Sequence, residues 1–285
     1  MTDTVHIACL QTRPRARFED AIAEAMPMAE EAVRTGAAML FLPEYCGGLA
    51  SRDGALVPPA AEEAVHPVLA AFRAFAGRRR VWVMLGSIAV TGPKGKILNR
   101  GYMIDDTGQV CGHYDKIHLF DVDLGKGQRY RESAHVVPGE RAVVHDTPLG
   151  RIGHTICYDL RFPQLYRSLA ASGAEILTCP AAFTRTTGEA HWHVLNRARA
   201  IENGAFMISP CAVGPVPGGG ESYGHSLIVD PWGKVLADGG SAAGVVAARI
   251  DPGEARRARA RIPSLSHDRQ FTLPRAAHTP GRKSA

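Results

Sequence analysis

Three residues of chemically useful types follow predicted strands. Glu44 comes directly after an apolar run, Cys157 closes another such run just before a predicted helix, and Lys116 follows a third. Ligands of α/β sheets bind at the carboxyl ends of strands, and the N–H groups of a following helix favour a cysteine thiolate. Taken singly, however, such residues are more often a turn carboxylate, a solvated lysine and a small core cysteine. Position alone therefore shows only that Glu44, Lys116 and Cys157 could form a catalytic set.

The elements that would position these residues alternate between strand and helix in the first third of the chain. Apolar runs predict strands at 5–10, 37–43 and 81–90, and helical spacing predicts helices at 18–34 and 62–76. This β-α-β-α-β order predicts a sheet that is covered by helices.

Three later turns predict β-hairpins, because each is punctuated by glycine and lies between apolar runs. The turns are at 106–108, 147–150 and 231–233. Further helices are predicted at 163–172 and 189–203, and strands at 175–179 and 205–211. Helical cover together with hairpins predicts an α/β protein with one mixed sheet or two.

The composition of the 285-residue chain is that of a globular protein, with 45% hydrophobic and 21% charged residues. These values exclude a disordered or low-complexity chain. Aromatic residues, at 7%, are too few for stacking surfaces spread over a nucleic acid. No apolar stretch reaches the roughly 18 residues of a membrane span, and the first residues lack the pattern of a signal peptide. The six cysteines show no paired spacing, so we expect a reduced, cytoplasmic protein.

Much of the formal net charge of +5 comes from the C-terminal end of the chain. The stretch richest in proline and glycine, 215–220, lies between two predicted strands and indicates a loop rather than a linker. We therefore predict a single domain over 1–262 and a basic tail over 263–285. The tail is predicted to be solvated, with neither nucleic acid nor membrane as a partner. A non-catalytic scaffold or an RNA-binding protein that uses this tail is the alternative from a different class.

The order of the Glu44, Lys116 and Cys157 segments resembles the nitrilase superfamily of carbon–nitrogen hydrolases, whose catalytic set is Glu, Lys and Cys. Further segments resemble its Nit branch: KIHLFD at 116–121, AFTRTTGEAHW at 182–192, RARAIEN at 197–203, YGHS at 223–226 and DPWG at 230–233. The resemblance covers about residues 4–265 and implies a four-layer α-β-β-α sandwich. The chain departs from the branch at Glu189, where proline is usual, and in the glycine- and charge-rich stretch 122–130, which borders the mouth of the family's site.

The resemblance implies a thiol amidase that needs neither a metal nor another cofactor. Cys157 would attack the amide carbonyl, with Glu44 as the general base that later protonates the departing ammonia. Lys116 and the backbone N–H of Tyr158 would stabilise the tetrahedral oxyanion. Glu44 would then activate the water that hydrolyses the thioester. The second carboxylate of the family pattern would be Glu132, which would position Lys116 or the substrate.

The Nit branch acts on ω-amides of small dicarboxylates, such as 2-oxoglutaramate or deaminated glutathione. Such substrates carry a free carboxylate, which requires a cation in the pocket. Arg185 and Arg161 are the candidates, and the alternative role of Arg161 is a pair with Asp159 or with the neighbourhood of Glu44. His118 lies close enough to the predicted mouth to be a further candidate. Within the superfamily, N-carbamoyl compounds and nitriles are the alternative substrates.

Two histidine patterns do not predict additional chemistry. His191 and His193 would point in nearly opposite directions on a helix, so they cannot bind one metal ion together. His154 lies three residues before Cys157 on a predicted strand, so the two side chains face opposite sides and His154 is expected to be packed or hydrogen-bonded.

The predicted helices at 163–172 and 189–203 correspond to the pair that forms a two-fold interface in the family. The resemblance therefore implies a homodimer, or a larger homo-oligomer, and a small-molecule amide as the other partner.

Overall fold

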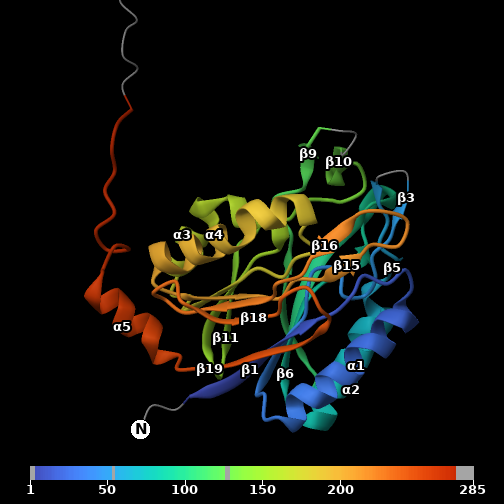
Figure 1. The fold of residues 1–285 in the computed structure, drawn as a ribbon, viewed down its shortest axis with the longest axis horizontal. Helices are drawn as coiled ribbons and strands as arrows, with labels where there is room; N and C mark the ends of the chain where they lie inside the picture. The colour runs from blue at the N-terminus through green and yellow to red at the C-terminus, as the bar shows by residue number, and fades with distance from the viewer. Residues whose placement is uncertain (1–3, 53–54, 126–128, 274–285) are drawn as a thin grey trace, which may run out of the picture.

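The computed structural model describes residues 4–52, 55–125 and 129–273. Two mixed β-sheets lie face to face, and helices cover the outer face of each (Figure 1). Of the tail predicted over 263–285, the part from residue 274 onward lies outside the described residues.

The first sheet has the strand order β19-β1-β2-β6-β7-β8, with β5 attached to β6. Its strands are β1 (Val5–Gln11), β2 (Met39–Phe41), β5 (Ala60–Ala61), β6 (Trp82–Thr91), β7 (Ile97–Ile104), β8 (Val110–Asp115) and β19 (Gly244–Ile250). The β1, β2 and β6 strands run parallel, whereas β7, β8 and β19 pair antiparallel with their neighbours. The helices α1 (Phe18–Arg34) and α2 (Pro67–Arg79) connect the parallel strands and pack on one face.

The second sheet has the strand order β11-β12-β13-β14-β17-β18. Its strands are β11 (Val143–Thr147), β12 (Gly150–His154), β13 (Ile176–Thr178), β14 (Phe206–Ser209), β17 (Leu227–Val229) and β18 (Val235–Asp238). The helices α3 (Pro163–Ala171) and α4 (Arg185–Asn203) cover its outer face. The last helix, α5 (Gly253–Arg261), follows β19.

Alternation along the strands divides the apolar side chains among three layers of core. Ile7 and Cys9 of β1 point into the core between the sheets, whereas Ala8 and Leu10 point toward the helices of the first sheet. In β14, Phe206 contributes to the core between the sheets and Met207 to the core under α3 and α4. Because successive side chains of a strand point to opposite faces, strands buried on both sides specify a sandwich with helices outside it.

Short strand pairs gather at one end of the sandwich, in the upper right of Figure 1. They are β3 (Ser51–Arg52) with β4 (Ala55–Leu56), β9 (Asp121–Asp123) with β10 (Arg129–Arg131), and β15 (Val213–Pro215) with β16 (Glu221–Tyr223). Short 3-10 turns complete the described chain: η1 (Glu63–Val65), η2 (Pro93–Gly95), η3 (Glu132–Ala134) and η4 (Cys157–Arg161).

The predicted fold class, a four-layer α-β-β-α sandwich, is confirmed, and the three predicted hairpins are present as β7–β8, β11–β12 and β17–β18. Two helix starts differ from prediction. α2 begins at Pro67, because proline suits the first helical position and the preceding residues form η1, while α4 begins at Arg185, four residues early. No helix among the described residues is long and apolar enough to cross a membrane.

Candidate active site

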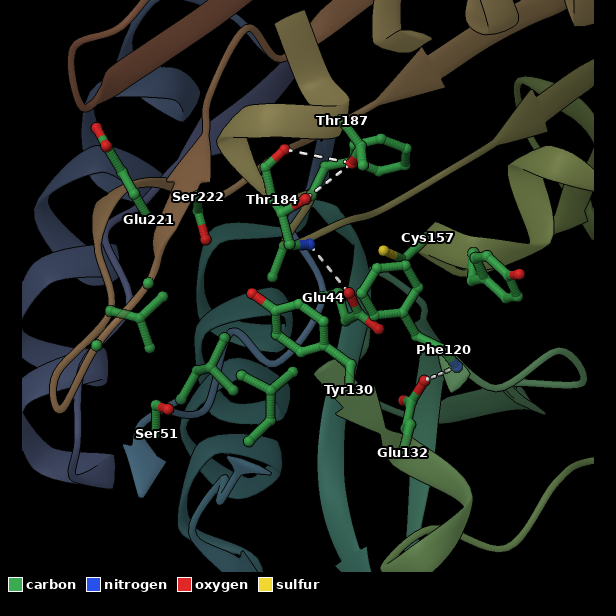
Figure 2. A pocket seen from close by; sticks show the side chains of 18 of the residues that line it. Glu44, Ser51, Phe120, Tyr130, Glu132, Cys157, Thr184, Thr187, Glu221 and Ser222 are labelled. Carbon is green, nitrogen blue, oxygen red and sulfur yellow. Dashed lines mark hydrogen bonds between the residues drawn. The ribbon is translucent and has the colours of Figure 1, made fainter. Parts of the chain in front are cut away.

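Cys157 lies at a sharp turn between the second sheet and its helices. It is the first residue of η4 and has a φ of 49°, an uncommon conformation for a residue with a side chain. Two contacts hold this turn: the Cys157 N–H donates to the carbonyl of Pro180 (2.9 Å), and the Ile156 N–H donates to Asp159 Oδ2 (2.8 Å). The turn directs the sulfur atom toward Glu44 (Figure 2).

Glu44 lies where the two sheets approach each other. It follows β2 by way of Leu42 and Pro43, and its Oε2 accepts a hydrogen bond of 3.0 Å from the N–H of Ala182, which belongs to the other half of the sandwich (Figure 2). Gly86 makes this approach possible, because a Cβ there would lie 2.0 Å from the Leu42 carbonyl oxygen and 2.4 Å from Pro180. Both sheets thus position the carboxylate.

Lys116 joins two carboxylates in the interior. Its Nζ lies 2.8 Å from Glu44 Oε1 and 2.8 Å and 3.0 Å from the two oxygens of Glu132. The side chains of Lys116, Glu44 and Glu132 are only 2%, 4% and 6% exposed. A lysine buried this deeply is compatible with folding only because it is paired.

Opposite charges keep this cluster ionised. Burial disfavours the ammonium, but the charges of Glu132 and Glu44 raise the pKa of Lys116 well above its usual value. Burial also opposes the Glu44 carboxylate, but Lys116 and the Ala182 N–H lower the pKa of Glu44. The three groups therefore carry a net charge of about −1.

The thiol of Cys157 is in the opposite situation. Burial, and then the negative charge of Glu44, raise the pKa of Cys157 well above its usual value, and Lys116 offsets only part of this effect. The resting site accordingly contains a neutral thiol beside a carboxylate. This differs from the expectation that helix N–H groups favour a thiolate, because η4 is only a short 3-10 turn and burial dominates.

Asn99 is a member of this cluster that the sequence analysis missed. Its Nδ2 donates to Glu44 Oε1 (2.9 Å) and to Glu132 Oε1 (3.2 Å), so that it joins the same two carboxylates as Lys116. The Phe120 N–H also donates to Glu132 Oε2 (2.6 Å), as Figure 2 shows. Asparagine is disfavoured inside strands, and its position in the run before the predicted hairpin turn at 106–108 was the signal that could have revealed it.

A cavity of about 270 Å³ lies over these groups (Figure 2). Glu44, Lys116, Glu132 and Cys157 line it, and the short strand pairs at this end of the sandwich supply much of its wall. Its other lining residues are largely aromatic, aliphatic, hydroxyl-bearing or glycine: Leu49, Ser51, Leu56, Phe120, Tyr130, Tyr158, Ala182, Phe183, Thr184, Thr187, Val216, Gly218, Gly219, Gly220 and Ser222, with Arg129 and Glu221 as charged exceptions. A cavity of this size suits a small molecule.

The backbone of Tyr158 is available to a ligand. Tyr158 lines the cavity directly after Cys157, and among the described residues its N–H has no hydrogen-bond acceptor. An N–H beside a candidate nucleophile has the position that oxyanion stabilisation requires.

The three side chains predicted to bind substrate lie elsewhere among the described residues. Arg185 pairs at the surface with Glu189 and Glu221, both at 3.0 Å. Arg161 lies over the Phe183 ring, 5.3 Å from its centre, and contacts His191 rather than Asp159.

His118 is occupied as well. Its Nδ1 lies 2.7 Å from Asp159 Oδ1, and its ring stacks on Phe162 with 3.5 Å between the ring centres. Because Asp159 also holds the turn at Cys157, His118 contacts a residue that supports this turn rather than the cavity.

Arg129 is the arginine that does line the cavity among the described residues. It lies on β10, within the stretch 122–130 in which the sequence departs from the Nit branch; residues 126–128 of that stretch lie outside the described part. Its Nη2 pairs with Asp123 Oδ2 at 2.7 Å, and its side chain is 63% exposed. The departure of this stretch from the Nit-branch sequence was the signal that marked it as unusual at the mouth of the site.

The prediction for His154 is confirmed. The ring is fully buried, its Nδ1 lies 3.2 Å from His145 Nε2, and it stacks on Tyr114 at 5.3 Å between ring centres. It therefore belongs to the packing behind the site.

A cysteine, a carboxylate and a buried ammonium around one small cavity are the groups of an enzyme that cleaves an acyl bond through a covalent intermediate. The family model described as carbon–nitrogen hydrolase matches residues 6–260, and the chain belongs to this family. The predicted enzyme class, a hydrolase of carbon–nitrogen bonds, is thereby confirmed.

Known relatives are consistent with the predicted branch. The chain is 39% identical over 267 residues to a deaminated glutathione amidase of Synechocystis sp. (strain PCC 6803 / GT-S), which covers 91% of this chain and 96% of the relative. The crystal structure of the C. elegans NitFhit protein superposes with a TM-score of 0.85 at 32% identity, covering 94% of this chain and 66% of that one. Saccharomyces cerevisiae Nit3, a member of branch 10 of the nitrilase superfamily, superposes with a TM-score of 0.79 at 26% identity, covering 91% of this chain and 94% of that one. The predicted membership of the nitrilase superfamily is confirmed.

Proposed function

We propose that this chain is a thiol amidase that converts the ω-amide of a small carboxylated acid, of the 2-oxo dicarboxylate type, to the acid and ammonia. The observation that carries the proposal is the buried cluster of Lys116 with Glu44 and Glu132 beside Cys157, under a cavity of about 270 Å³. The relative named deaminated glutathione amidase supports the choice of substrate class.

In the first step the Cys157 sulfur forms a bond to the amide carbon, and the thiol proton passes to Glu44. The negative charge moves from the carboxylate to the substrate oxygen, so the site with its bound substrate keeps its total charge and no new charge is buried. Lys116 and the Tyr158 N–H stabilise this oxyanion; one such donor contributes about 10²–10³ in rate.

In the second step the carbon–nitrogen bond breaks, and Glu44 transfers its proton to the departing nitrogen, which leaves as ammonia. The acyl group remains on Cys157 as a thioester. Water then attacks the thioester carbon and gives one proton to Glu44, which returns it to the sulfur as the acid leaves. Glu132 and Asn99 take no proton and keep Lys116 and Glu44 in position.

A panel of amides tests this function by the product released. We expect ammonia from the ω-amides of 2-oxo dicarboxylates, including 2-oxoglutaramate and deaminated glutathione, and slower release from neutral aliphatic amides. Carbon dioxide from N-carbamoyl amino acids, or turnover of nitriles alone, would instead support the alternative activities within the superfamily.

Arg129 is the residue that we propose to bind the free carboxylate, in place of Arg161, Arg185 or His118. Arginine pairs with carboxylates through two parallel N–H donors, and Arg129 lines the cavity while the other three side chains contact protein groups. The substrate would compete with Asp123 for its guanidinium group.

Arg129→Gln should raise KM for the carboxylated amide by about tenfold, because one partly screened charged contact is lost, and should change kcat little. KM for a neutral amide such as butyramide should change less than about threefold. Steady-state ammonia release measures both values. The matched control is Arg131→Gln on the same strand, whose side chain lies outside the cavity lining. Equal effects of Arg129→Gln on both substrates would contradict the assignment.

We also propose that two copies associate through an apolar face that includes α4. Val194 and Ile201, one heptad apart on α4, are 68% and 53% exposed, and Trp232 and Ile262 are 52% and 58% exposed. The Ile201 side chain lies against Gly233, next to Trp232, so Ile201 and Trp232 are neighbours on this face. Apolar patches of this kind mark association surfaces.

Ile201→Asp should convert the dimer into a monomer in sedimentation velocity experiments, because it buries a charge in the apolar contact. Val65→Asp replaces another exposed aliphatic residue, 71% exposed and distant in the chain, and should leave the dimer intact. A wild-type protein that sediments as a monomer at micromolar concentration would rule out this association.

The six cysteines support a reducing compartment. All lie within the described residues, and none takes part in a disulfide. Cytoplasmic location is therefore our proposal for this enzyme.

A further inference from the structure

Two histidines and an aspartate from separate elements converge at a second point, outside the cavity lining. His193 comes from α4, His225 from the segment after β16, and Asp238 from the end of β18. One ring nitrogen of each histidine and one carboxylate oxygen of Asp238 all lie within 4.8 Å of one another. The side chains are 34%, 26% and 35% exposed, so that solvent and a small ion can reach them.

The Asp238 carboxylate bridges the two imidazoles. Its Oδ2 lies 3.0 Å from His193 Nε2, and its Oδ1 lies 2.8 Å from His225 Nδ1 and 2.9 Å from the Gly240 nitrogen. The carboxylate is thus an acceptor, and each imidazole directs an N–H toward it.

Contacts outside the cluster fix the orientation of His225. Its backbone has a φ of 52°, its N–H donates to the Gly240 carbonyl (2.8 Å), and its carbonyl accepts from the buried Trp192 Nε1 (2.7 Å). The Tyr223 ring stacks on the imidazole with 4.5 Å between ring centres. These contacts hold the imidazole where its Nδ1 faces Asp238.

We propose that His193, His225 and Asp238 form a binding site for one divalent transition-metal ion, with Zn²⁺ as its representative. Two imidazole nitrogens and one carboxylate oxygen are ligands that zinc accepts, with water in the remaining position. Bond lengths of about 2.0–2.2 Å would set tetrahedral ligand atoms roughly 3.3 Å apart. The hydrogen-bonded separations of 2.8 and 3.0 Å need to change only slightly to reach this value.

Protons are conserved when the ion enters. The ring nitrogens that face Asp238 give up their hydrogens to solvent, and the other ring nitrogen of each imidazole carries a hydrogen when the ion is bound. The ion then occupies the space between the rings and the carboxylate, where the two hydrogens had been. His191 takes no part, because it contacts Arg161, so the site does not join His191 with His193.

The ion would brace one wall of the amidase cavity. Thr187 of α4 and Ser222 of β16 line the cavity, and Tyr223 follows Ser222 directly. The helix packs closely here, since a Cβ on Gly188 would lie 2.3 Å from the Tyr223 side chain. Coordination by His193 and His225 would tie α4 to this segment.

Zn²⁺ titrated into the metal-free full-length chain tests the site, with calorimetry for affinity and mass spectrometry for metal content. We expect wild type to bind one more Zn²⁺ than His225→Gln, or to bind it at least about tenfold more tightly, because even an outer-shell contact contributes about 10–100-fold to metal affinity. His191→Gln, on the same helix, should match wild type. The cysteines are the same in all three proteins, so any binding to thiols cancels in the comparison.

Thermal unfolding provides a second readout. Zn²⁺ at about a hundred times its dissociation constant should raise the Tm of wild type by roughly 5 °C and leave that of His225→Gln unchanged. Because His225 has a strained backbone, His193→Gln on the partly exposed face of α4 is measured as well and should give the same loss. Equal zinc content, affinity and Tm shift in wild type and both variants would overturn the proposal.

Discussion

Cys157→Ala is expected to release ammonia at no more than about 10⁻⁴ of the wild-type rate, because loss of a nucleophile removes the covalent route altogether. The fold should remain, since alanine fits the same space and makes the same backbone contacts to Pro180. Ammonia assays with a saturating ω-amide measure the rate, and near-ultraviolet circular dichroism measures the fold. Turnover within about tenfold of wild type in a folded variant would refute the mechanism.

A matched cysteine control separates this effect from a general loss of thiols. Cys111 is exposed and lies at the outer edge of the first sheet, on β8. Cys111→Ala should retain full activity. Mass spectrometry of wild type quenched during turnover should find the acyl group on the peptide containing Cys157, and none in Cys157→Ala.

Lys116→Met is expected to lose both activity and stability. Removal of the oxyanion cation should lower kcat by about 10²–10³. The Glu44 and Glu132 carboxylates would then face each other in the interior without a cation, a change that costs about 3–5 kcal/mol of unfolding free energy. Ammonia release and denaturant unfolding measure the two effects. The exposed Lys234, changed to Met, serves as the control and should alter neither.

The double variant Lys116→Met with Glu132→Gln separates stability from catalysis. Removing one of the facing carboxylates should restore much of the lost unfolding free energy, because the buried repulsion disappears. Activity should not return, since the cation that stabilises the oxyanion is still missing. If the double variant were destabilised by the full sum of the two single changes, the interaction between these charges would be absent.

The unfolding free energy of the single variant Lys116→Met should depend on pH with a definite sign. In wild type, Lys116 helps to lower the pKa of Glu44, so this stabilisation is present above the ordinary glutamate pKa and is lost as pH falls through the lowered value. In Lys116→Met, repulsion raises the pKa of one carboxylate, and the folded variant gains protons more readily than the unfolded chain. The unfolding free energy that Lys116→Met lacks relative to wild type should therefore become smaller as pH falls from about 7 toward 5.

Local patterns were sufficient to predict most of the scaffold. The α1 helix has the predicted bounds, and β1 differs from prediction by one residue, because helical spacing and short apolar runs report on residues that are neighbours in sequence. The β19 strand was not predicted. It pairs with β1 at the other end of the chain, and such long-range pairing depends on the whole topology rather than on the seven residues themselves.

The reactive groups followed from sequence, but their partners did not. Glu44, Lys116, Glu132 and Cys157 could be named from their segments and a family resemblance, whereas Asn99 and Arg129 emerged only from the folded chain. Likewise, His193 was considered with its neighbour in sequence, although the side chains beside it, His225 and Asp238, come from other elements.

The sequence by itself determined most of the longer strands and helices, and which residue types could carry acyl chemistry, because both depend on residue identity and short-range spacing. Only the tertiary structure decided which charges meet in the interior, which arginine lines the cavity, and that burial keeps Cys157 protonated beside Glu44. The physical reason is that charge pairing and desolvation depend on distances of a few ångströms between residues far apart in the chain. Those distances exist only once the two sheets have packed together.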